Sequence, residues 1–334
     1  MLLPRSVNMD HSGGPPSPLQ GSSSAPRDVA LGGRTRAGYV TLLGRPNAGK
    51  STLLNRLVGE HLSIVTPKAQ TTWQRVTGIL TVGQDQIVFL DTPGLLAARD
   101  LLQRAMLAAA LEAVAEADVL VLVVDTTHAP GPEDRERLLR ALADAAAPLR
   151  VALNKFDIAP ADAVLAWQEW VAGTLGAPSY PVSALMGEGT DELLDAVRAD
   201  LPEGPFLYPA DDIATDPVRF FVAELVRETI FEQYRQEIPY ATFCQVEEFR
   251  EDQRPIYIHV NIYAERKSQK RILVGHGGAA IRELGTAARA KIEHFIGTDV
   301  YLDLWVKPLE AWRKNRIHLS QLGFRVPADD ETHS

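Results

Sequence analysis

The sequence has almost no cysteine and no long hydrophobic run. Its single cysteine, Cys244, excludes an intramolecular disulfide and a metal site built from several cysteines, and a reducing, cytoplasmic setting is the simplest inference. The longest apolar runs, such as residues 119–124, are far shorter than the roughly 20 residues of a membrane-spanning helix. We therefore expect a globular protein without an integral membrane segment. With 334 residues, 46% of them hydrophobic, the chain can form a substantial core in two domains.

The chain also lacks a net positive charge, which taken alone argues against a nucleic-acid partner. The total charge of −9 is, however, unevenly distributed. Between Glu265 and Arg316 there are 11 Lys or Arg and 6 Asp or Glu, a local charge of +5 that leaves −14 on the rest. A basic region within an otherwise acidic chain favours a nucleic-acid interface in that region.

The distribution of residue types predicts a tail followed by an α/β domain. Proline, serine and glycine cluster in residues 1–36, which we interpret as a disordered tail. Over residues 37–203, short apolar runs alternate with helical patterns, which predicts a mostly parallel, doubly wound sheet that binds ligands at the carboxyl ends of its strands. The predicted strands are residues 39–44, 86–91, 119–125, 150–155 and 180–184, and the predicted helices are residues 100–116, 132–146, 161–175 and 190–200.

A second domain of different character follows. Residues 204–216 are rich in Pro, Gly and Asp and predict a linker. Residues 217–320 then predict the order helix, strand, strand, helix, helix, strand, an α+β arrangement, and residues 321–334 are interpreted as a C-terminal tail.

Residues 44–51, GRPNAGKS, match the phosphate-binding pattern G-x-x-x-x-G-K-[ST] between a predicted strand and a predicted helix. In that context backbone N–H groups surround a phosphate, Lys50 reaches the β- and γ-phosphate oxygens, and the Ser51 hydroxyl binds Mg²⁺. The pattern predicts a P-loop NTPase. The residues expected at the phosphates are Gly44, Arg45, Pro46, Asn47, Ala48, Gly49, Lys50, Ser51 and Thr52.

The stretch NKFD at residues 154–157 indicates which base is bound. Asp157 can accept hydrogen bonds from both N1–H and the exocyclic amine of guanine, a donor pattern that adenine lacks. Asn154 is expected to tie this loop to the phosphate loop, with the Lys155 stem along the base and the Ala184 backbone near the guanine O6. GTP and GDP are therefore the predicted ligands. The residues expected at the base are Asn154, Lys155, Asp157, Ser183, Ala184 and Leu185.

The stretch DTPG, residues 91–94, ends another predicted strand. Asp91 suits a water-mediated contact with Mg²⁺, and the Gly94 N–H can sense the γ-phosphate. Upstream, Thr71 and Thr72 fall in a loop that can close over Mg²⁺, and we favour Thr72 as the ligand, with Thr71 as the alternative. The whole stretch Asp91, Thr92, Pro93 and Gly94 is expected to contact the nucleotide, the predicted metal ligands are Ser51, Thr72 and Asp91, and the predicted catalytic residues are Lys50, Thr72, Asp91 and Gly94.

Leu95 follows the DxxG glycine directly, at the position where Ras-type GTPases carry a water-orienting glutamine. Because a leucine side chain cannot hydrogen-bond water, hydrolysis is expected to be slow or to depend on backbone atoms, on a monovalent cation such as K⁺, or on a partner. The alternative is a GTP-gated RNA-binding scaffold with negligible hydrolysis, in which Leu95 is only a packed residue.

The helical segments around GHGG, residues 275–278, resemble the GXXG loop of type II KH domains, which clamps single-stranded RNA. The variable pair of this loop contains no Lys or Arg, so the phosphate contacts shift to flanking side chains. The predicted RNA-binding residues are Lys270, Arg271, Gly275, His276, Gly277, Gly278, Arg282 and Arg289, in a basic cluster that also includes Lys267 and Lys291.

Together these motifs resemble the bacterial Era family of GTPases over residues 38–323. The resemblance is most specific at GRPNAGKSTLLN, KAQTT, DTPGL, NKFD, SAL and ILVGHGGAAIRELGTAAR. It implies GTP hydrolysis, binding near the 3′ end of small-subunit (16S) rRNA, a role in 30S subunit assembly, and peripheral membrane association in some members. We expect a monomer. One departure is Trp73, which stands where the family commonly has a basic residue.

Other interpretations compete with these. Trp305 and Trp312 could stack on bases, but an aromatic residue in a β-rich run is more often part of the core, and we interpret Cys244 in the same way. For the chain as a whole, a further alternative is a membrane-signalling GTPase whose C-terminal domain does not bind RNA.

Overall fold

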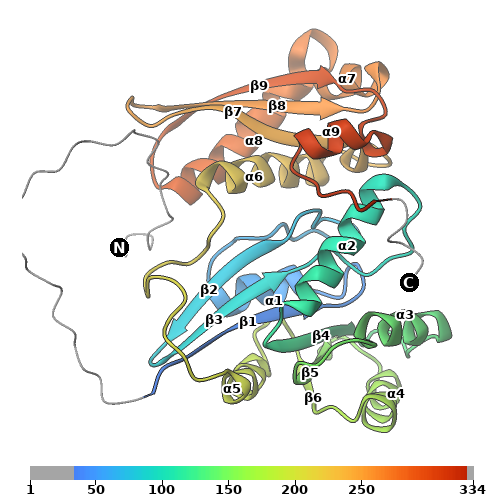
Figure 1. Cartoon of the computed structure of the whole chain (residues 1–334). Coiled ribbons are helices and arrows are strands. Elements are labelled where there is room, and N and C mark those ends of the chain that lie inside the picture. The colour runs from blue at the N-terminus through green and yellow to red at the C-terminus, as the bar shows by residue number, and fades with distance from the viewer. Residues whose placement is uncertain (1–33, 329–334) are drawn as a thin grey trace, which may run out of the picture.

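The computed structural model describes residues 34–328, which form two domains, one above the other in Figure 1. The elements of the first domain run from Arg36 to Asp200 and those of the second from Val218 to Gln321. The tail predicted over residues 1–36 lies almost wholly outside the described residues. Among the residues described, no helix combines the length and the apolar character needed to span a membrane.

The first domain is built on a six-stranded sheet. Its strands are β1 (Arg36–Leu43), β2 (Val76–Val82), β3 (Asp85–Asp91), β4 (Val119–Asp125), β5 (Leu149–Asn154) and β6 (Ser179–Val182). The spatial order is β2-β3-β1-β4-β5-β6, and every neighbouring pair is parallel except β2 and β3. This confirms the doubly wound sheet. The antiparallel β2 was not among the predicted strands, because Gly78, its third residue, weakens the strand pattern while making room for Leu54 and Val58.

Helices cover both faces of this sheet (Figure 1). They are α1 (Lys50–Val58), α2 (Leu101–Ala115), α3 (Pro132–Leu142), α4 (Ala161–Trp170), which continues into a π-helical turn (Val171–Leu175), and α5 (Thr190–Asp200). Leu42 and Val121 pack into a core with residues of α1 and α5, whereas Leu43 and Leu122 pack with residues of α3 and α4. Burial on both faces explains the continuously apolar strands and leaves their carboxyl ends open for a ligand.

The second domain has a three-stranded sheet with helices on one face. Its elements are α6 (Val218–Gln233), β7 (Thr242–Arg250), β8 (Ile256–Ala264), α7 (Lys267–Val274), α8 (Ala279–Ile296), β9 (Val300–Pro308) and α9 (Arg316–Gln321). β8 lies in the centre, antiparallel to β7 and parallel to β9. α6 and α8 lie between this sheet and the first domain in Figure 1, and the core includes Val226, Ile258 and Leu284. The element order confirms the type II KH arrangement.

The linker expected at residues 204–216 is packed against the first domain. The side-chain carbonyl of Gln86 accepts hydrogen bonds from the N–H groups of Leu207 and Tyr208 at 2.8 and 2.9 Å. The N–H of Ile79 donates to the carbonyl of Ile213 at 2.8 Å. The linker therefore follows the β2–β3 side of the sheet as an ordered segment.

The C-terminal tail was predicted to begin too early, at residue 321. After α9 the chain continues with Leu322 and Phe324, both of which are buried. The Phe324 ring lies 5.7 Å from that of Phe243, measured between centroids. The packed part of the chain therefore extends to Phe324, because these apolar side chains are covered by the rest of the structure.

A cluster of apolar side chains joins the two domains. The ring of Trp73, from the first domain, lies 5.6 Å from Trp312 and 6.3 Å from Phe243 of the second. We name this set the interdomain aromatic cluster; its buried members are Trp73, Leu96, Leu102, Ala105, Met106, Phe243, Trp312, Leu319, Leu322 and Phe324. Position 73 is thus a packing position. Trp312 is a core residue as predicted, but the same interpretation of Trp305 was wrong, since 56% of it is exposed on β9.

Candidate nucleotide-binding site and RNA interface

The loop between β1 and α1 is shaped by its contact with the NKFD loop. Gly49 precedes α1 with φ 98°, and a Cβ at this position would lie 2.1 Å from Asn154 Nδ2. Only glycine fits there, because both the backbone angle and the space exclude a side chain. As at the start of any helix, the first N–H groups of α1 have no partner within the helix. They are available to an anion that binds in this loop.

Lys50 lies at the start of α1 and is only 6% exposed. Its ammonium donates hydrogen bonds to the carbonyls of Gly44 and Arg45 at 3.3 and 3.1 Å. Burial lowers the pKa of the Lys50 ammonium, an effect that the Asp91 carboxylate opposes. A buried cation whose hydrogen bonds within residues 34–328 go to loop carbonyls is suited to receiving the charge of a phosphate.

Three oxygen-bearing side chains meet beside Lys50. The Ser51 hydroxyl donates to Asp91 Oδ2 at 2.6 Å, and Thr72 Oγ1 lies 3.0 Å from Ser51 Oγ and 3.3 Å from Asp91 Oδ2. The other oxygen, Asp91 Oδ1, is buried and makes no hydrogen bond with the residues described. Burial raises the pKa of the Asp91 carboxyl, against the opposing effects of Lys50 and Ser51. A set of hydroxyl and carboxylate oxygens with an unsatisfied buried oxygen fits Mg²⁺, which prefers such ligands.

The opposite end of the site is held together by Asn154, which is 2% exposed. Its Nδ2 donates to the carbonyl of Ala48 at 2.7 Å, and its Oδ1 accepts from the N–H of Ala184 at 2.9 Å. One side chain thus fixes the phosphate loop, the NKFD loop and the SAL loop relative to each other, as expected for the first two. Asp157 is exposed and lines the cavity that these loops enclose.

Asp125, at the end of β4, is a site residue that was not predicted from the sequence. Its Oδ2 accepts a hydrogen bond from Lys155 Nζ at 2.6 Å, which fixes the Lys155 stem across the site. Burial tends to raise the pKa of the Asp125 carboxyl, but hydrogen bonds from Lys155 and Thr127 outweigh it and hold that pKa below its usual range. Its position at the carboxyl end of a predicted parallel strand, where ligands bind in such sheets, could have identified it as a site residue.

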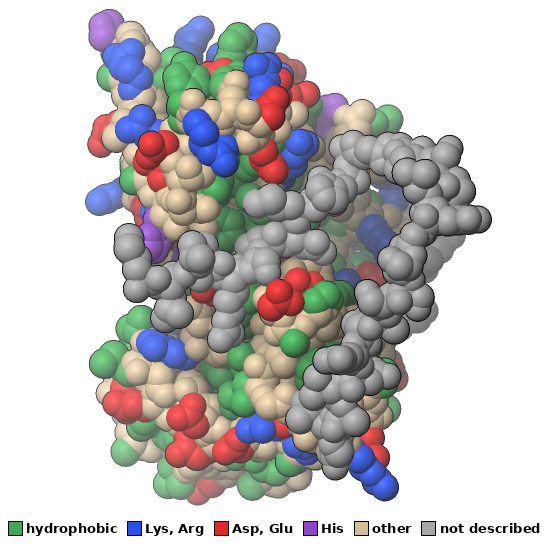
Figure 2. Space-filling model, turned by 90° about the vertical axis from the view of Figure 1, so that its left-hand side faces the viewer, with side chains coloured by type: hydrophobic (Ala, Val, Ile, Leu, Met, Phe, Trp, Pro, Cys, Tyr) green, Lys and Arg blue, Asp and Glu red, His purple; other side chains and the backbone are tan. Residues whose placement is uncertain are grey.

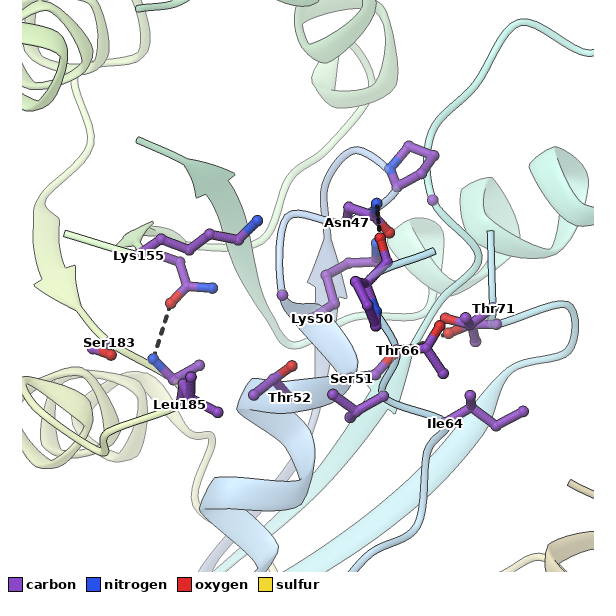
Figure 3. Close-up of a pocket in the computed structure, with 18 of the residues that line it drawn as sticks. Asn47, Lys50, Ser51, Thr52, Ile64, Thr66, Thr71, Lys155, Ser183 and Leu185 are labelled. Atoms are coloured by element: carbon purple, nitrogen blue, oxygen red, sulfur yellow. Dashed lines mark hydrogen bonds between the residues drawn. The ribbon is translucent and has the colours of Figure 1, made fainter. Parts of the chain in front are cut away.

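These elements surround a cavity of about 410 Å³. Figure 3 shows Lys155 and Leu185 on one side of it, Ile64, Thr66 and Thr71 on the other, and Lys50 and Ser51 at the start of α1. The predicted residues that line it are Pro46, Asn47, Gly49, Lys50, Ser51, Thr52, Thr72, Gly94, Asn154, Lys155, Asp157, Ser183, Ala184 and Leu185. Lining residues that were not predicted are Ile64, Val65, Thr66, Pro67, Gln70 and Ile158, and the alternative metal ligand Thr71 also lines it.

Some predicted contact residues lie behind the cavity wall. The Arg45 side chain pairs with Asp134 at 2.6 Å and does not line the cavity. The Thr92 hydroxyl is buried and donates to the carbonyl of Leu42 at 2.8 Å. Gly44, Ala48, Asp91 and Pro93 also fall outside the lining. Asp91 has no exposed surface and is connected to the cavity through Ser51 and Thr72.

Leu95 does not face the nucleotide cavity. Only 1% of it is exposed, and its side chain packs in the core that α3 and α4 cover. Its N–H donates to the carbonyl of Gly44 at 3.0 Å. The backbone after DTPG is therefore tied to the phosphate loop, and the side chain at the Ras glutamine position contributes packing.

The GHGG loop connects α7 to α8. A Cβ at Gly275 would lie 2.7 Å from the Ala280 Cβ, so the loop approaches α8 more closely than any other residue would allow. Arg282 Nη1 donates to the carbonyl of Gly277 at 2.9 Å and braces the loop from the first turn of α8. Such a tight glycine loop lets an RNA backbone approach closely.

The predicted RNA-binding cations occupy different surroundings. Lys270 and Arg271 are exposed on α7, next to Ile272, which is 51% exposed. Arg289 lies further along α8, with its guanidinium 3.7 Å from Glu293. On the face seen in Figure 2, Lys and Arg side chains gather mainly on the upper, second domain, and many Asp and Glu side chains lie on the lower one.

Lys291, expected in the basic cluster, forms ion pairs with a neighbouring helix instead. Its ammonium lies 2.8 Å from Glu228 and 2.6 Å from Glu232, both on α6. These two ion pairs fasten α8 to α6, because Lys291 projects from α8 towards that helix.

Comparison with known protein families gives a match in each of the two domains. Residues 39–155 match the family described as 50S ribosome-binding GTPase, and residues 237–313 match the KH domain family. The chain is 40% identical to the GTPase Era of Halothermothrix orenii over 87% of its own length and 99% of the relative's. It is 42% identical to the GTPase Era of Geobacter metallireducens over 86% of its length and 98% of the relative's.

Two solved structures extend the likeness to the whole fold. One is a variant of Aquifex aeolicus Era bound to GDP and aluminium fluoride, and the other is Era in complex with MgGDPNP and nucleotides 1506–1542 of 16S ribosomal RNA. Each matches with a TM-score of 0.82 and 36% identity, over 86% of this chain and 99% of the other.

Proposed function

The chain belongs to the Era family of GTPases, and on that premise we propose that it is a GTP-controlled protein that binds the 3′ region of 16S rRNA and assists 30S subunit assembly. The observation that carries this proposal is the presence, in one chain, of a guanine-nucleotide cavity and a GHGG loop flanked by exposed cations. An Era structure of the same overall fold holds both MgGDPNP and nucleotides 1506–1542 of 16S rRNA. Membership of a GTPase family favours a hydrolysing switch over the non-hydrolysing scaffold.

We assign the nucleotide contacts from the site geometry. Lys50 and the N–H groups at the start of α1 bind the phosphates, and Asp157 accepts the hydrogen bonds of guanine. Ser51 and Thr72 would hold Mg²⁺, with Asp91 beside them, and Thr72 is preferred to Thr71 because its hydroxyl lies 3.0 Å from that of Ser51. When bound, Mg²⁺ neutralises charge that develops on the phosphate oxygens.

We further propose that hydrolysis requires help from outside the polypeptide. Because Leu95 is buried, its side chain cannot orient the attacking water. A K⁺ ion among the oxygen atoms of the cavity wall would supply positive charge at the phosphates. Replacing K⁺ with Na⁺ at constant ionic strength should slow single-turnover hydrolysis on the order of 100-fold, the effect of losing one electrostatic contact to the transition state. Equal rates in the two salts would refute the proposed cation.

RNA binding is expected to depend on salt and on the nucleotide. An RNA covering the 3′ region of 16S rRNA should bind more tightly to the protein loaded with a non-hydrolysable GTP analogue than to the GDP form. Because each phosphate contact to a single strand contributes about 0.7 to the slope of log affinity against log salt, the double change Lys270→Ala and Arg271→Ala should reduce that slope by about 1.4. Fluorescence titration at several salt concentrations measures both effects.

Arg254→Ala is the matched control for this titration. Arg254 is also an exposed cation of the second domain, but it lies in the turn before β8, at the opposite end of that strand from α7. It should leave the salt slope unchanged. Absence of binding even at low salt would remove the RNA function and favour a GTPase whose second domain has another partner.

A further inference from the structure

A buried arginine of the second domain reaches the nucleotide site of the first. Arg227 lies on α6 and is 1% exposed. Its Nε donates to Glu224 Oε1 at 2.8 Å, and its Nη2 donates both to Glu224 and to the backbone carbonyl of Thr71. The guanidinium also lies over the ring of Trp73, 4.6 Å from its centroid. Arg227 thus contacts the residues on both sides of Thr72.

The segment that contains Thr72 is docked along α6 by other contacts as well. The Lys68 ammonium donates to the carbonyls of Phe231 and Tyr234, where α6 ends. Near the other end of the segment, Glu228 Oε1 accepts a hydrogen bond from the N–H of Val65 at 3.3 Å. The same oxygen lies 2.9 Å from His61 Nε2. Among these hydrogen bonds, that of Arg227 reaches a residue adjacent to Thr72, and Arg227 shares the contact with Trp73 with the rings of Phe243 and Trp312.

The contacts of Arg227 restrict where the Thr72 hydroxyl can lie. A carbonyl held on one side of a residue and a ring held on the other fix the backbone between them, since each residue has only two soft dihedral angles. With both neighbours fixed, Thr72 Oγ1 is held 3.0 Å from Ser51 Oγ and 3.3 Å from Asp91 Oδ2. We propose that Arg227 is a positioning residue of the GTPase site, which holds Thr72 at the metal position from within the KH domain.

This proposal rests on the assignment of Thr72 as a Mg²⁺ ligand under the proposed function. It adds that the second domain takes part in assembling the catalytic site, through a cation–π contact and a hydrogen bond. Side chains that orient metal ligands typically change metal affinity or activity by about 10- to 100-fold when removed. A purely structural arginine would instead change folding stability without changing the response to Mg²⁺.

The test uses Arg227→Met, which retains much of the buried volume while removing the hydrogen bond and the charge. We expect kcat for GTP to fall about 10- to 100-fold and the Mg²⁺ concentration for half-maximal activity to rise about tenfold, while KM for GTP changes less. A fluorescent GTP analogue should dissociate faster from the variant than from the original protein in Mg²⁺, but at the same rate in EDTA. Arg227→Lys, which can still donate to Thr71 and lie near Trp73, should recover part of the loss.

Two further variants make the result decisive. Arg219→Met changes an exposed arginine of the same helix, which contacts Phe249 of its own domain, and should leave the Mg²⁺ response unchanged. Thr72→Ala should shift the Mg²⁺ response at least as far as Arg227→Met does. If Thr72→Ala shifts it and Arg227→Met does not, the role of Arg227 is refuted while the metal site stands. If neither shifts it, the assignment of Thr72 fails, and the inference fails with it.

Should Arg227→Met not fold, Trp73→Leu supplies the same test from the other side of the contact. It removes the ring beneath the guanidinium, but it also loosens the interdomain aromatic cluster, so Phe243→Leu, which loosens the same cluster and keeps the Trp73 ring, is its control. A smaller shift in the same direction supports the proposal, and an unchanged Mg²⁺ response in a folded Trp73→Leu protein contradicts it.

Discussion

Lys50→Ala is expected to remove most of the affinity for GTP, and with it hydrolysis, while leaving the fold intact. The Lys50 ammonium is buried, and in the described part of the chain it is hydrogen-bonded to two loop carbonyls, so a phosphate that binds there meets a positive charge already shielded from water. Removing one partner of such a buried charge pair costs about 2 to 5 kcal/mol, a loss of roughly 30-fold to several thousand-fold in affinity. Equilibrium binding of a fluorescent GTP analogue measures this loss directly.

The fold should survive Lys50→Ala because burial already disfavours the charge. The lowered pKa of Lys50 means that its ammonium is less stable in the folded protein than in water. The thermal melting curve of the variant should therefore stay close to the original. Arg45→Ala is the matched control: its side chain pairs with Asp134 outside the cavity, and GTP affinity should change little. Full GTP affinity in a folded Lys50→Ala protein would defeat the assignment of the phosphate loop.

Asp157→Asn is expected to change the base that the protein selects. The loop that carries Asp157 is held in place by Asn154 and by the Lys155–Asp125 pair, so the substitution should alter the chemistry of the contact without moving it. An asparagine amide can donate to the 2-oxo group of xanthine, whereas guanine presents a donor there. GTP affinity should fall by about 1 to 3 kcal/mol, roughly 5- to 150-fold, and XTP affinity should rise by a similar factor.

Competition between GTP and XTP for the cavity measures the switch. Asp162→Asn, an exposed aspartate in the first turn of α4, is the control and should keep the preference for GTP. If the Asp157→Asn protein still selects GTP over XTP, Asp157 does not read the base through a bidentate contact.

The parallel sheet and the loops at its edge were predictable because their signals are local. When a motif that binds phosphate, metal or base directly follows an apolar parallel strand, it lies at the carboxyl end of that strand. This holds wherever the strand lies in the sheet. The order of elements in the second domain was equally readable from alternating and helical patterns. In both domains the prediction depended on short stretches whose meaning does not require knowing their partners.

The contact of Asn154 with the phosphate loop was predictable because a motif carries it, but other features created by contacts distant in sequence were not. Trp73 and Arg227 are 154 positions apart, and no spacing rule connects a residue after paired threonines with one on a later helix. In the sequence, Asp125 is simply the last residue of a predicted strand, and its role in holding Lys155 depends on a contact between residues 30 positions apart. Leu322 and Phe324 stand just before a polar C-terminal stretch and were assigned to the tail with it, and their burial depends on the aromatic rings that cover them.

The interdomain aromatic cluster has a consequence for how the two domains can move. The covalent linker runs along the β2–β3 side of the first domain, whereas the cluster anchors the C-terminal segment against α2 on the other side (Figure 1). These two attachments hold the interface at its opposite edges, and the contacts of α6 with Val65, Lys68 and Thr71 hold it between them. As long as the cluster stays packed, the second domain cannot turn or separate at the α2 edge without exposing buried aromatic rings. The last packed residues of the chain therefore limit the degrees of freedom available to the whole molecule.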